Sequence, residues 1–177
     1  VHDLIKATVV ASANDAAVAL AEEVAGSEDA FVEKMNEKAK SLGMKETTFK
    51  NCNGLDEEGH LTSAYDVAVM SRELIKHKEI FEFTSIWMDN LRGGKTQIVN
   101  TNKLLKTYKG ITGLKTGTTS QAGSCISATA QRDGLTLVAV VLGSASGKER
   151  FTDAAALLDY GFANYCIYTP AFKEDIP

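Results

Sequence analysis

Two short polar motifs, far apart in the sequence, carry the side chains best suited to chemistry. Ser12-Ala13-Asn14 offers a hydroxyl that can relay a proton and an amide that can hold a carbonyl group. Lys115-Thr116-Gly117 offers a cation for proton transfer or anion binding, a hydroxyl for a carboxylate, and a glycine that lets a ligand lie against the backbone. Each motif alone is weak, because Lys-Thr-Gly occurs by chance in roughly 4% of chains this long and Ser12–Asn14 also suits a plain turn between helices. Their joint occurrence is what indicates a functional site.

The composition bounds the kinds of protein that can carry these motifs. The chain has 177 residues, of which 44% are hydrophobic and 24% charged, which is typical of one globular domain spanning residues 1–177. A formal net charge of −4 and the lack of a basic cluster exclude a nucleic-acid surface. No apolar run is long enough for a membrane span, and no signal peptide is visible in these residues.

The cysteines and histidines give no sign of a metal site or a cofactor. Cys52, Cys125 and Cys166 are an odd number and lack the Cys-x-x-Cys spacing, so neither a disulfide framework nor a zinc site is indicated. We expect three small, partly buried thiols. The three histidines share no spacing suited to a metal, so we expect no metal and no cofactor.

The first part of the chain, about residues 1–84, is predicted to be helical. Asn14 and Ser27 are the expected N-caps of two helices, and Ser63 with Asp66 forms a variant of the capping box. Residues rich in Asn, Gly and acidic side chains predict a long surface connection, in which Asp56-Glu57-Glu58 is solvated. The apolar spacing places the helices at 3–11, 15–25, 28–42 and 64–76, and the connection at 47–60.

The next part, about residues 85–146, is predicted to be rich in strands, and a closing helix follows at about 147–165. Phe151, Ala155, Leu158 and Phe162 are spaced to form the buried side of that helix. The order of helices, antiparallel strands and a last helix indicates the α+β class. The strands are expected at 85–89 and 96–100, as a hairpin, and at 111–117, 124–131 and 135–142, with a tight turn at 132–134.

One strand suggests a larger sheet than this chain supplies. Residues 135–142 are apolar at nearly every position, which predicts a central strand covered on both faces. A long apolar edge strand is prone to aggregation. We therefore expect one or two strands from a missing N-terminal segment to lie beside it.

The two motifs and their surroundings resemble the serine-type D-alanyl-D-alanine carboxypeptidases, which are low-molecular-mass penicillin-binding proteins of the β-lactamase/transpeptidase-like superfamily. The resemblance covers nearly the whole chain. Beyond the two motifs it rests on the helix after Ser12-Ala13-Asn14, on 31–43, on Asn53-Gly-Leu-Asp56, on Asn100-Thr-Asn-Lys-Leu-Leu105, on Gly113-Leu-Lys-Thr-Gly-Thr118, on Ala122-Gly123, on Arg132-Asp-Gly134, on Leu142-Gly143, on Arg150 and on Tyr160-Gly-Phe162.

The resemblance implies a fold with a helical subdomain and an antiparallel sheet flanked by helices, and an enzyme that removes the terminal D-alanine from peptidoglycan pentapeptide stems through an acyl-enzyme. Ser12 and Lys115 would relay protons, and Asn14 would hold the substrate amide. The terminal carboxylate would bind Thr116, Thr118 and Arg150, while the strand around Gly117 pairs with the substrate backbone. β-Lactams would be covalent inhibitors, and the enzyme would act outside the cytoplasm, in the bacterial cell envelope.

The chain departs from the family pattern at its most important position. The family's nucleophile lies in a Ser-x-x-Lys motif, and no lysine here has a serine three residues before it. The nearest variants are Thr47-x-x-Lys50, in a predicted loop, and Thr112-x-x-Lys115, which reuses the lysine of the second motif. We therefore expect an internal piece of a longer exported enzyme, inactive alone, whose membrane contact would depend on segments absent here.

Two other functions are also compatible with the sequence. A class A β-lactamase-like hydrolase would need a deacylating carboxylate between the two motifs, and Asp56-Glu57-Glu58 is not a convincing source. A non-catalytic peptidoglycan-binding domain would lack the nucleophile altogether. Rapid penicillin hydrolysis would favour the first alternative, and an upstream reading frame without Ser-x-x-Lys would favour the second.

Overall fold

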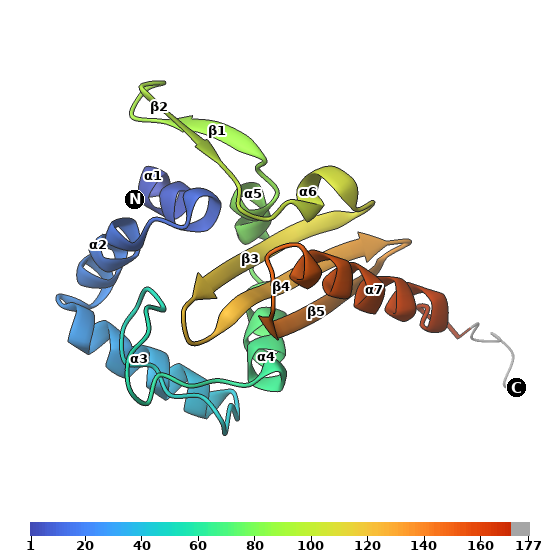
Figure 1. The fold of residues 1–177 in the computed structure, drawn as a ribbon, viewed down its shortest axis with the longest axis horizontal. Helices are drawn as coiled ribbons and strands as arrows, with labels where there is room; N and C mark the ends of the chain where they lie inside the picture. Colours follow the sequence, from blue (N-terminus) through green and yellow to red (C-terminus); the bar gives the residue numbers. More distant parts are fainter. Residues whose placement is uncertain (171–177) are drawn as a thin grey trace, which may run out of the picture.

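The structure, a computed structural model, describes residues 1–170. Helices form the first half of the chain, an antiparallel sheet follows, and a long helix closes the fold (Figure 1). This order confirms the α+β class. The helices α2 and α3 lie to one side of the sheet, and a two-stranded hairpin projects above it (Figure 1).

The four helices predicted in the first half are all present, although one cap was predicted wrongly. Ser27 Oγ accepts a hydrogen bond from the backbone N–H of Ala30, and Ser63 Oγ accepts one from Asp66, as expected of N-caps. Asn14 is not a cap: it is the first helical residue, and the extended residue before it is Ala13. The helices are α1 (His2–Lys6), α2 (Asn14–Ala25), α3 (Glu28–Ser41) and α4 (Ala64–Leu74).

The helix predicted at 3–11 changes character halfway. After α1 the chain continues as a π-helix, Ala7–Ala11, which ends at Ser12 with φ 58° and ψ 40°. π-Helical turns are rare and are frequently found at functional sites. The left-handed conformation is costly for a residue other than glycine. This abrupt end turns the chain sharply and leaves Ser12 exposed at the surface.

Asp66 serves a different purpose from the one predicted. Its carboxylate does not return to Ser63 to complete a capping box. It accepts hydrogen bonds from the backbone N–H of Glu46 and the hydroxyl of Thr47, both at 2.8 Å. Because Asp66 is only 2% exposed, these bonds replace the water that its charge loses on burial. The pairing anchors the start of the connection between α3 and α4.

In the described part of the chain, the main sheet has three antiparallel strands in the order β3-β4-β5, and a separate hairpin is formed by β1 and β2. The register places Lys115 opposite Ser127 and Gly117 opposite Cys125. The hairpin begins later than predicted, at Met88 rather than residue 85. The strands are β1 (Met88–Leu91), β2 (Thr96–Val99), β3 (Ile111–Thr119), β4 (Gly123–Arg132) and β5 (Leu135–Ser144).

Three short helical segments were not predicted. Each has three or four residues, which is too short for a pattern of apolar residues to reveal. The 3₁₀ turn at Lys78–Ile80 leads directly into α5 (Phe81–Thr84), and α6 (Leu104–Thr107) precedes β3. The hydroxyl of Thr84 donates to the carbonyl of Thr112 at 2.6 Å, so α5 buttresses the start of β3.

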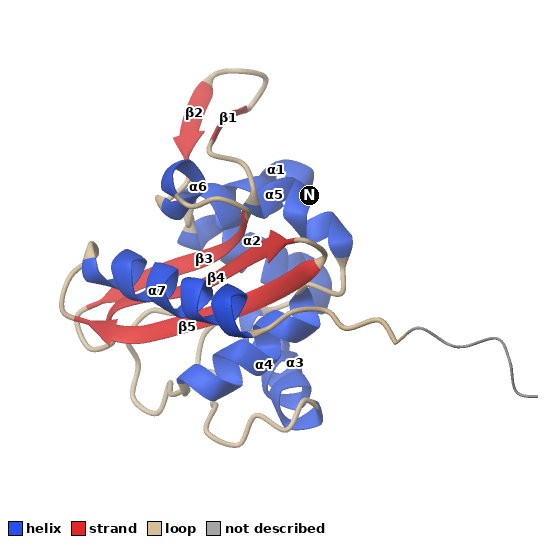
Figure 2. Cartoon of the chain, turned by 90° about the vertical axis from the view of Figure 1, so that its right-hand side faces the viewer, coloured by secondary structure: helices blue, strands red, loops and turns tan. Residues whose placement is uncertain are grey.

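Helix α7 (Glu149–Asn164) covers one face of the sheet, and α4 lies against the other (Figure 2). As predicted, Leu158 is buried, and Phe151, Ala155 and Phe162 pack around the core. A Cβ on Gly161 would lie 2.5 Å from Leu137 Cδ1, so a larger residue there would force the Leu137 side chain to shift. The core consists of Leu104, Ile126, Ala128, Ala130, Ala139, Ala154 and Leu158.

Strand β5 lies at the edge of the sheet formed by residues 1–170. It pairs with β4 along one side, and α7 and α4 cover its two faces as predicted. The further strand expected beside it stays a prediction. Of the three cysteines, Cys52 and Cys125 are half-buried, but Cys166 is exposed, contrary to expectation. Within the described residues, every helix is too short or too polar to cross a bilayer.

Truncating Leu158 should show how strongly α7 is held to the sheet. Leu158 is 1% exposed in the core, so Leu158→Ala should lower the free energy of unfolding by about 2–5 kcal/mol. Leu157 is 50% exposed, and Leu157→Ala should change it by less than about 0.5 kcal/mol. Urea titration of both variants measures the difference. Equal effects at the two positions would contradict the packing described.

The left-handed conformation of Ser12 can be tested by two substitutions that both remove the hydroxyl. Glycine adopts this conformation without a steric cost and alanine does not, so Ser12→Gly should be more stable than Ser12→Ala by about 1 kcal/mol. The same denaturant titration compares the two. If alanine matched or exceeded glycine, Ser12 would not occupy the left-handed region.

Candidate active site

The two sequence motifs meet in the structure. Lys115 Nζ, on β3, donates a hydrogen bond of 2.6 Å to Ser12 Oγ at the end of the π-helix, although 103 residues separate them. The ammonium also donates to the carbonyl oxygen of its neighbour Thr116 at 2.8 Å. The strand and the helical turn thus hold a hydroxyl and an amine within reach of one proton.

The environment of Lys115 disfavours its charge. Burial, and to a lesser extent the nearby positive charge of Arg150, together lower the pKa of the Lys115 ammonium to about 8. Lys115 forms no salt bridge with a carboxylate in the described part of the chain. Two cations without a nearby acid form a positive centre that favours an anionic ligand.

Arg150, in the first turn of α7, holds the far end of β3. Its Nη1 donates to the carbonyl oxygen of Gly117 at 2.9 Å, to Thr118 Oγ1 at 2.8 Å and to the carbonyl oxygen of Cys125 at 3.3 Å. Its guanidinium stacks over Phe151 at 4.9 Å from the ring centroid. These contacts fix the guanidinium beside the strand that carries Lys115.

Thr116 is buried, and its hydroxyl already forms a hydrogen bond within the chain. It donates to Thr101 Oγ1 at 2.6 Å. Thr101 lies between two buried asparagines, and Asn100 Oδ1 accepts the backbone N–H of Asn102 at 2.8 Å. This turn fixes the position of Thr101 and, through it, the hydroxyl of Thr116.

Gly117 and Asn14 are exposed. A Cβ on Gly117 would meet no atom within 4 Å, so packing within the chain does not require a glycine there. Asn14 starts α2 two residues after Ser12, and within residues 1–170 its amide makes no hydrogen bond, so it is free for a ligand. The edge of β3 opposite β4 carries no strand in the described region.

The structure therefore brings the predicted site residues together in two groups and leaves Asn14 apart. Ser12 and Lys115 touch directly; Arg150 touches Gly117 and Thr118, and Thr116 reaches Lys115 through its carbonyl oxygen. Asn14 contacts none of these residues by a hydrogen bond in the described region and is close to Ser12 because it follows two residues later in the chain.

Two contributors were not among the predicted site residues. Thr101 belongs to the Asn-Thr-Asn segment of the resemblance, and this was the only signal that pointed to it. Asp56 is exposed, as predicted for a solvated loop, but its carboxylate also binds the turn that follows β3. A carboxylate in an acidic loop gives no sequence sign of a partner so far along the chain.

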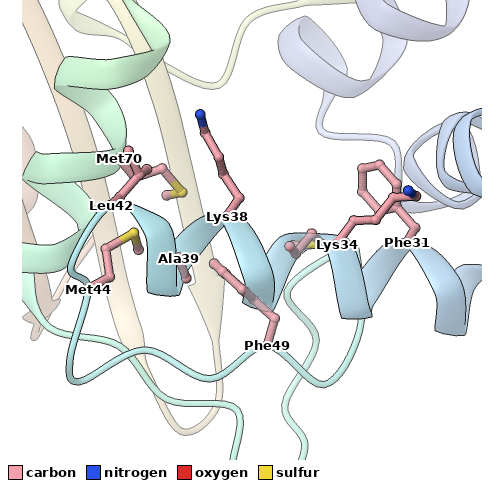
Figure 3. A pocket seen from close by; sticks show the side chains of 9 residues that line it. Phe31, Lys34, Lys38, Ala39, Leu42, Met44, Phe49 and Met70 are labelled. Atoms are coloured by element: carbon pink, nitrogen blue, oxygen red, sulfur yellow. The ribbon is translucent and has the colours of Figure 1, made fainter.

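A separate hollow of about 280 Å³ lies between α3 and α4 and contains none of the predicted site residues (Figure 3). Apolar side chains such as Phe31, Met44 and Met70 line it, with Lys34 and Lys38 as its charged members. Lys38 already pairs with Glu73. Within residues 1–170, no cluster of His, Cys, Asp and Glu is suited to hold a metal ion.

Curated proteins similar to this chain are named D-alanyl-D-alanine carboxypeptidases. It is 47% identical over 178 residues to the D-alanyl-D-alanine carboxypeptidase DacF of Bacillus subtilis, covering 99% of this chain and 46% of that protein. It is 37% identical over 171 residues to DacC of Escherichia coli, covering 96% and 42%. The chain thus spans less than half the length of these relatives.

Solved structures of penicillin-binding proteins share the fold. Penicillin-binding protein D2 of Listeria monocytogenes, in its cefotaxime-bound form, matches with a TM-score of 0.83 and 38% identity, covering 90% of this chain and 65% of that one. Penicillin-binding protein 6B of Escherichia coli matches with a TM-score of 0.85 and 41% identity, covering 92% and 51%. The expected β-lactamase/transpeptidase-like fold is confirmed.

A family profile gives the same result from sequence alone. The profile described as D-alanyl-D-alanine carboxypeptidase matches residues 1–146, a span that holds both motifs and the whole sheet. With the identities to the curated relatives, this match establishes the assignment. The chain belongs to the D-alanyl-D-alanine carboxypeptidase family, Peptidase_S11.

Proposed function

We propose that this chain is the larger part of the catalytic domain of a serine D,D-carboxypeptidase that removes the terminal D-alanine from peptidoglycan pentapeptide stems. The observation that carries the proposal is the 2.6 Å contact between the desolvated Lys115 ammonium and Ser12. The enzyme would act outside the cytoplasm, in a bacterial cell envelope.

The chemistry is acyl transfer in two steps. A serine oxygen attacks the carbonyl carbon of the penultimate D-alanine, the C–N bond to the terminal D-alanine breaks, and the leaving amine takes up a proton. Water then attacks the ester, releasing the shortened peptide and restoring the serine. The attacking serine belongs to a Ser-x-x-Lys segment, which residues 1–177 do not contain, so the chain alone would be inactive.

The residues of the chain would bind and orient the substrate and move protons. Ser12 and Lys115 would form the route by which a proton reaches the leaving amine, since a pKa near 8 lets the ammonium give up a proton readily. Asn14 would donate to the substrate amide oxygen. The terminal carboxylate would bind Thr118, beside the positive centre of Lys115 and Arg150.

The strand β3 would bind the stem peptide as an added strand. Its free edge offers backbone N–H and C=O groups, and the bare surface at Gly117 lets another backbone approach closely. Thr116 would act through its buried bond to Thr101, which fixes the strand and the Lys115 that precedes it. β-Lactams would bind along the same edge, and D2 of Listeria monocytogenes has been solved with cefotaxime and with ampicillin.

Two observations weigh against the other functions. The Asp56 carboxylate is bonded to the turn after β3, and Glu57 accepts from Asn51, so neither is free to act as the deacylating base of a β-lactamase. A non-catalytic domain would have no need for a cation desolvated against a hydroxyl. A non-catalytic domain would differ from the enzyme in lacking the nucleophilic serine.

Intact-mass analysis with a penicillin tests the proposal. The 177-residue chain should keep its mass of 19.0 kDa without an adduct. The protein from the complete reading frame should gain one penicilloyl group and release D-alanine from a pentapeptide. A complete protein without Ser-x-x-Lys, or without an adduct, would indicate a non-catalytic domain, and rapid loss of the penicillin would indicate a β-lactamase.

Replacing Lys115 should disable the complete enzyme. Lys115→Met removes both the proton route and the charge, so the rate of acylation by penicillin should fall roughly 100-fold or more. Lys109 is exposed near the start of the same strand, and Lys109→Met should acylate at the wild-type rate. Stopped-flow or gel measurements with a fluorescent penicillin compare them. Equal rates for the two variants would remove Lys115 from the mechanism.

Gly117→Ala should separate ligand binding from stability. The added methyl group meets open space within the chain, and alanine is the better strand former, so the free energy of unfolding should stay level or rise by up to about 1 kcal/mol. The methyl group would obstruct a strand-like ligand, so acylation of the complete protein should slow. Unchanged acylation would show that the ligand does not lie against this part of β3.

A further inference from the structure

Asp56 links two parts of the chain that frame the candidate site. Its Oδ2 accepts hydrogen bonds from Ser120 Oγ at 2.7 Å and from the backbone N–H of Gln121 at 3.2 Å. Asp56 belongs to the loop between α3 and α4, and its partners form the turn between β3 and β4. Figure 1 shows this loop rising toward the arrowhead of β3. We call this contact the Asp56 clasp.

The loop presents Asp56 in a fixed geometry. Asn51 accepts the backbone N–H of Gly54 at 2.8 Å and donates to the carbonyl oxygen of Leu55 at 3.1 Å. At the base of the loop, Asn36 exchanges two hydrogen bonds with the backbone of Phe49, at 2.9 and 2.8 Å. The loop is therefore held by its own bonds and by Asn36 of α3 up to the residue that reaches the end of β3.

The end of β3 and the turn after it are held by two charged side chains, Arg150 and Asp56. Arg150 holds Gly117 and Thr118 from α7, and Asp56 holds the next turn from the helical part. Between the loop and this end of β3 lies a cavity of about 590 Å³, whose lining includes Leu55, Asp56, Thr118 and Cys125. The clasp borders this cavity, since Asp56 and Gln121 both line it, and it ties the loop on one side of the cavity to the turn on the other.

The charge on Asp56 is stabilised by its partners. Hydrogen bonds from the hydroxyls of Thr119 and Ser120 hold the pKa of the Asp56 carboxyl below its usual value. The carboxylate is thus ionised at neutral pH and accepts charge-assisted hydrogen bonds, which are stronger than neutral ones.

We propose that Asp56 is a positioning residue, which fixes the Gly117–Thr119 end of β3 against the α3–α4 loop and thereby sets the width of the cleft that binds the stem peptide or a β-lactam. The inference rests on the proposed function. Asp56 itself touches no reacting atom, because its carboxylate is occupied by the turn at Ser120 and Gln121.

The test compares Asp56→Ala with a matched control in the protein from the complete reading frame. Without the clasp the strand end moves more freely, so the apparent binding constant for a β-lactam should weaken roughly three- to tenfold, while the limiting acylation rate changes less than about twofold. Glu58 is exposed in the same loop and forms no ion pair or hydrogen bond in the described region. Glu58→Ala should therefore behave as wild type.

A double-mutant cycle identifies the clasp as the cause. If Asp56 acts through Ser120, then Ser120→Ala should weaken binding in the same direction, and the double variant should be little worse than Asp56→Ala alone. Fully additive effects would overturn the proposal. So would unchanged binding in Asp56→Ala, or an equal loss in Glu58→Ala.

Hydrogen exchange on the 177-residue chain provides a readout independent of acylation. Asp56→Ala should increase exchange at the Gln121 amide, which loses its acceptor, and leave Thr129 in the middle of β4 unchanged. If Asp56→Ala exchanged faster at Gln121 but bound the β-lactam normally, the hydrogen bond between Asp56 and Gln121 would be established, but the positioning role of Asp56 would be overturned. If the wild-type complete protein is not acylated at all, the proposed function fails, whatever exchange shows about the clasp.

Discussion

The site depends on one contact: an ammonium removed from water and held against a hydroxyl from the other half of the chain. Lys115 loses hydration on β3, and within residues 1–170 its ammonium recovers two hydrogen bonds, to Ser12 and to the Thr116 carbonyl oxygen. A charge in this position is unfavourable unless an anion or a proton acceptor joins it. The contact therefore makes the site ready for a carboxylate and for proton transfer, at a cost that the surrounding fold must offset.

The rest of the structure holds the two ends of this contact in place. The π-helix ends in a left-handed Ser12, which projects the hydroxyl, and the core beneath α7 fixes the sheet that carries Lys115. Arg150 then holds the end of β3, and Asp56 holds the turn that follows it. The helical part and the sheet also meet through α4 and α5, so the geometry of the cleft is set by side chains widely separated in the sequence.

Much of this arrangement could be predicted from the sequence, because local patterns determine it. Apolar spacing located the long helices and the three main strands, and the two motifs located Ser12 and Lys115. The errors have physical reasons. Asn14 suits a cap, but the left-handed turn at Ser12 shifts the helix start by one residue. Asp56 and Asp66 have partners fixed only by tertiary structure, which no local pattern encodes.

The most direct test of the central contact is the pKa of Lys115, measured by NMR titration of its side-chain nitrogen in the 177-residue chain, with Lys115→Arg to assign the signal. The account predicts a value of about 8, because burial and Arg150 both oppose the charge. It also predicts that Arg150→Ala raises this value by removing the neighbouring positive charge. A pKa near 10.4, as for a solvated lysine, would show that the ammonium is not desolvated against Ser12 and would contradict the account.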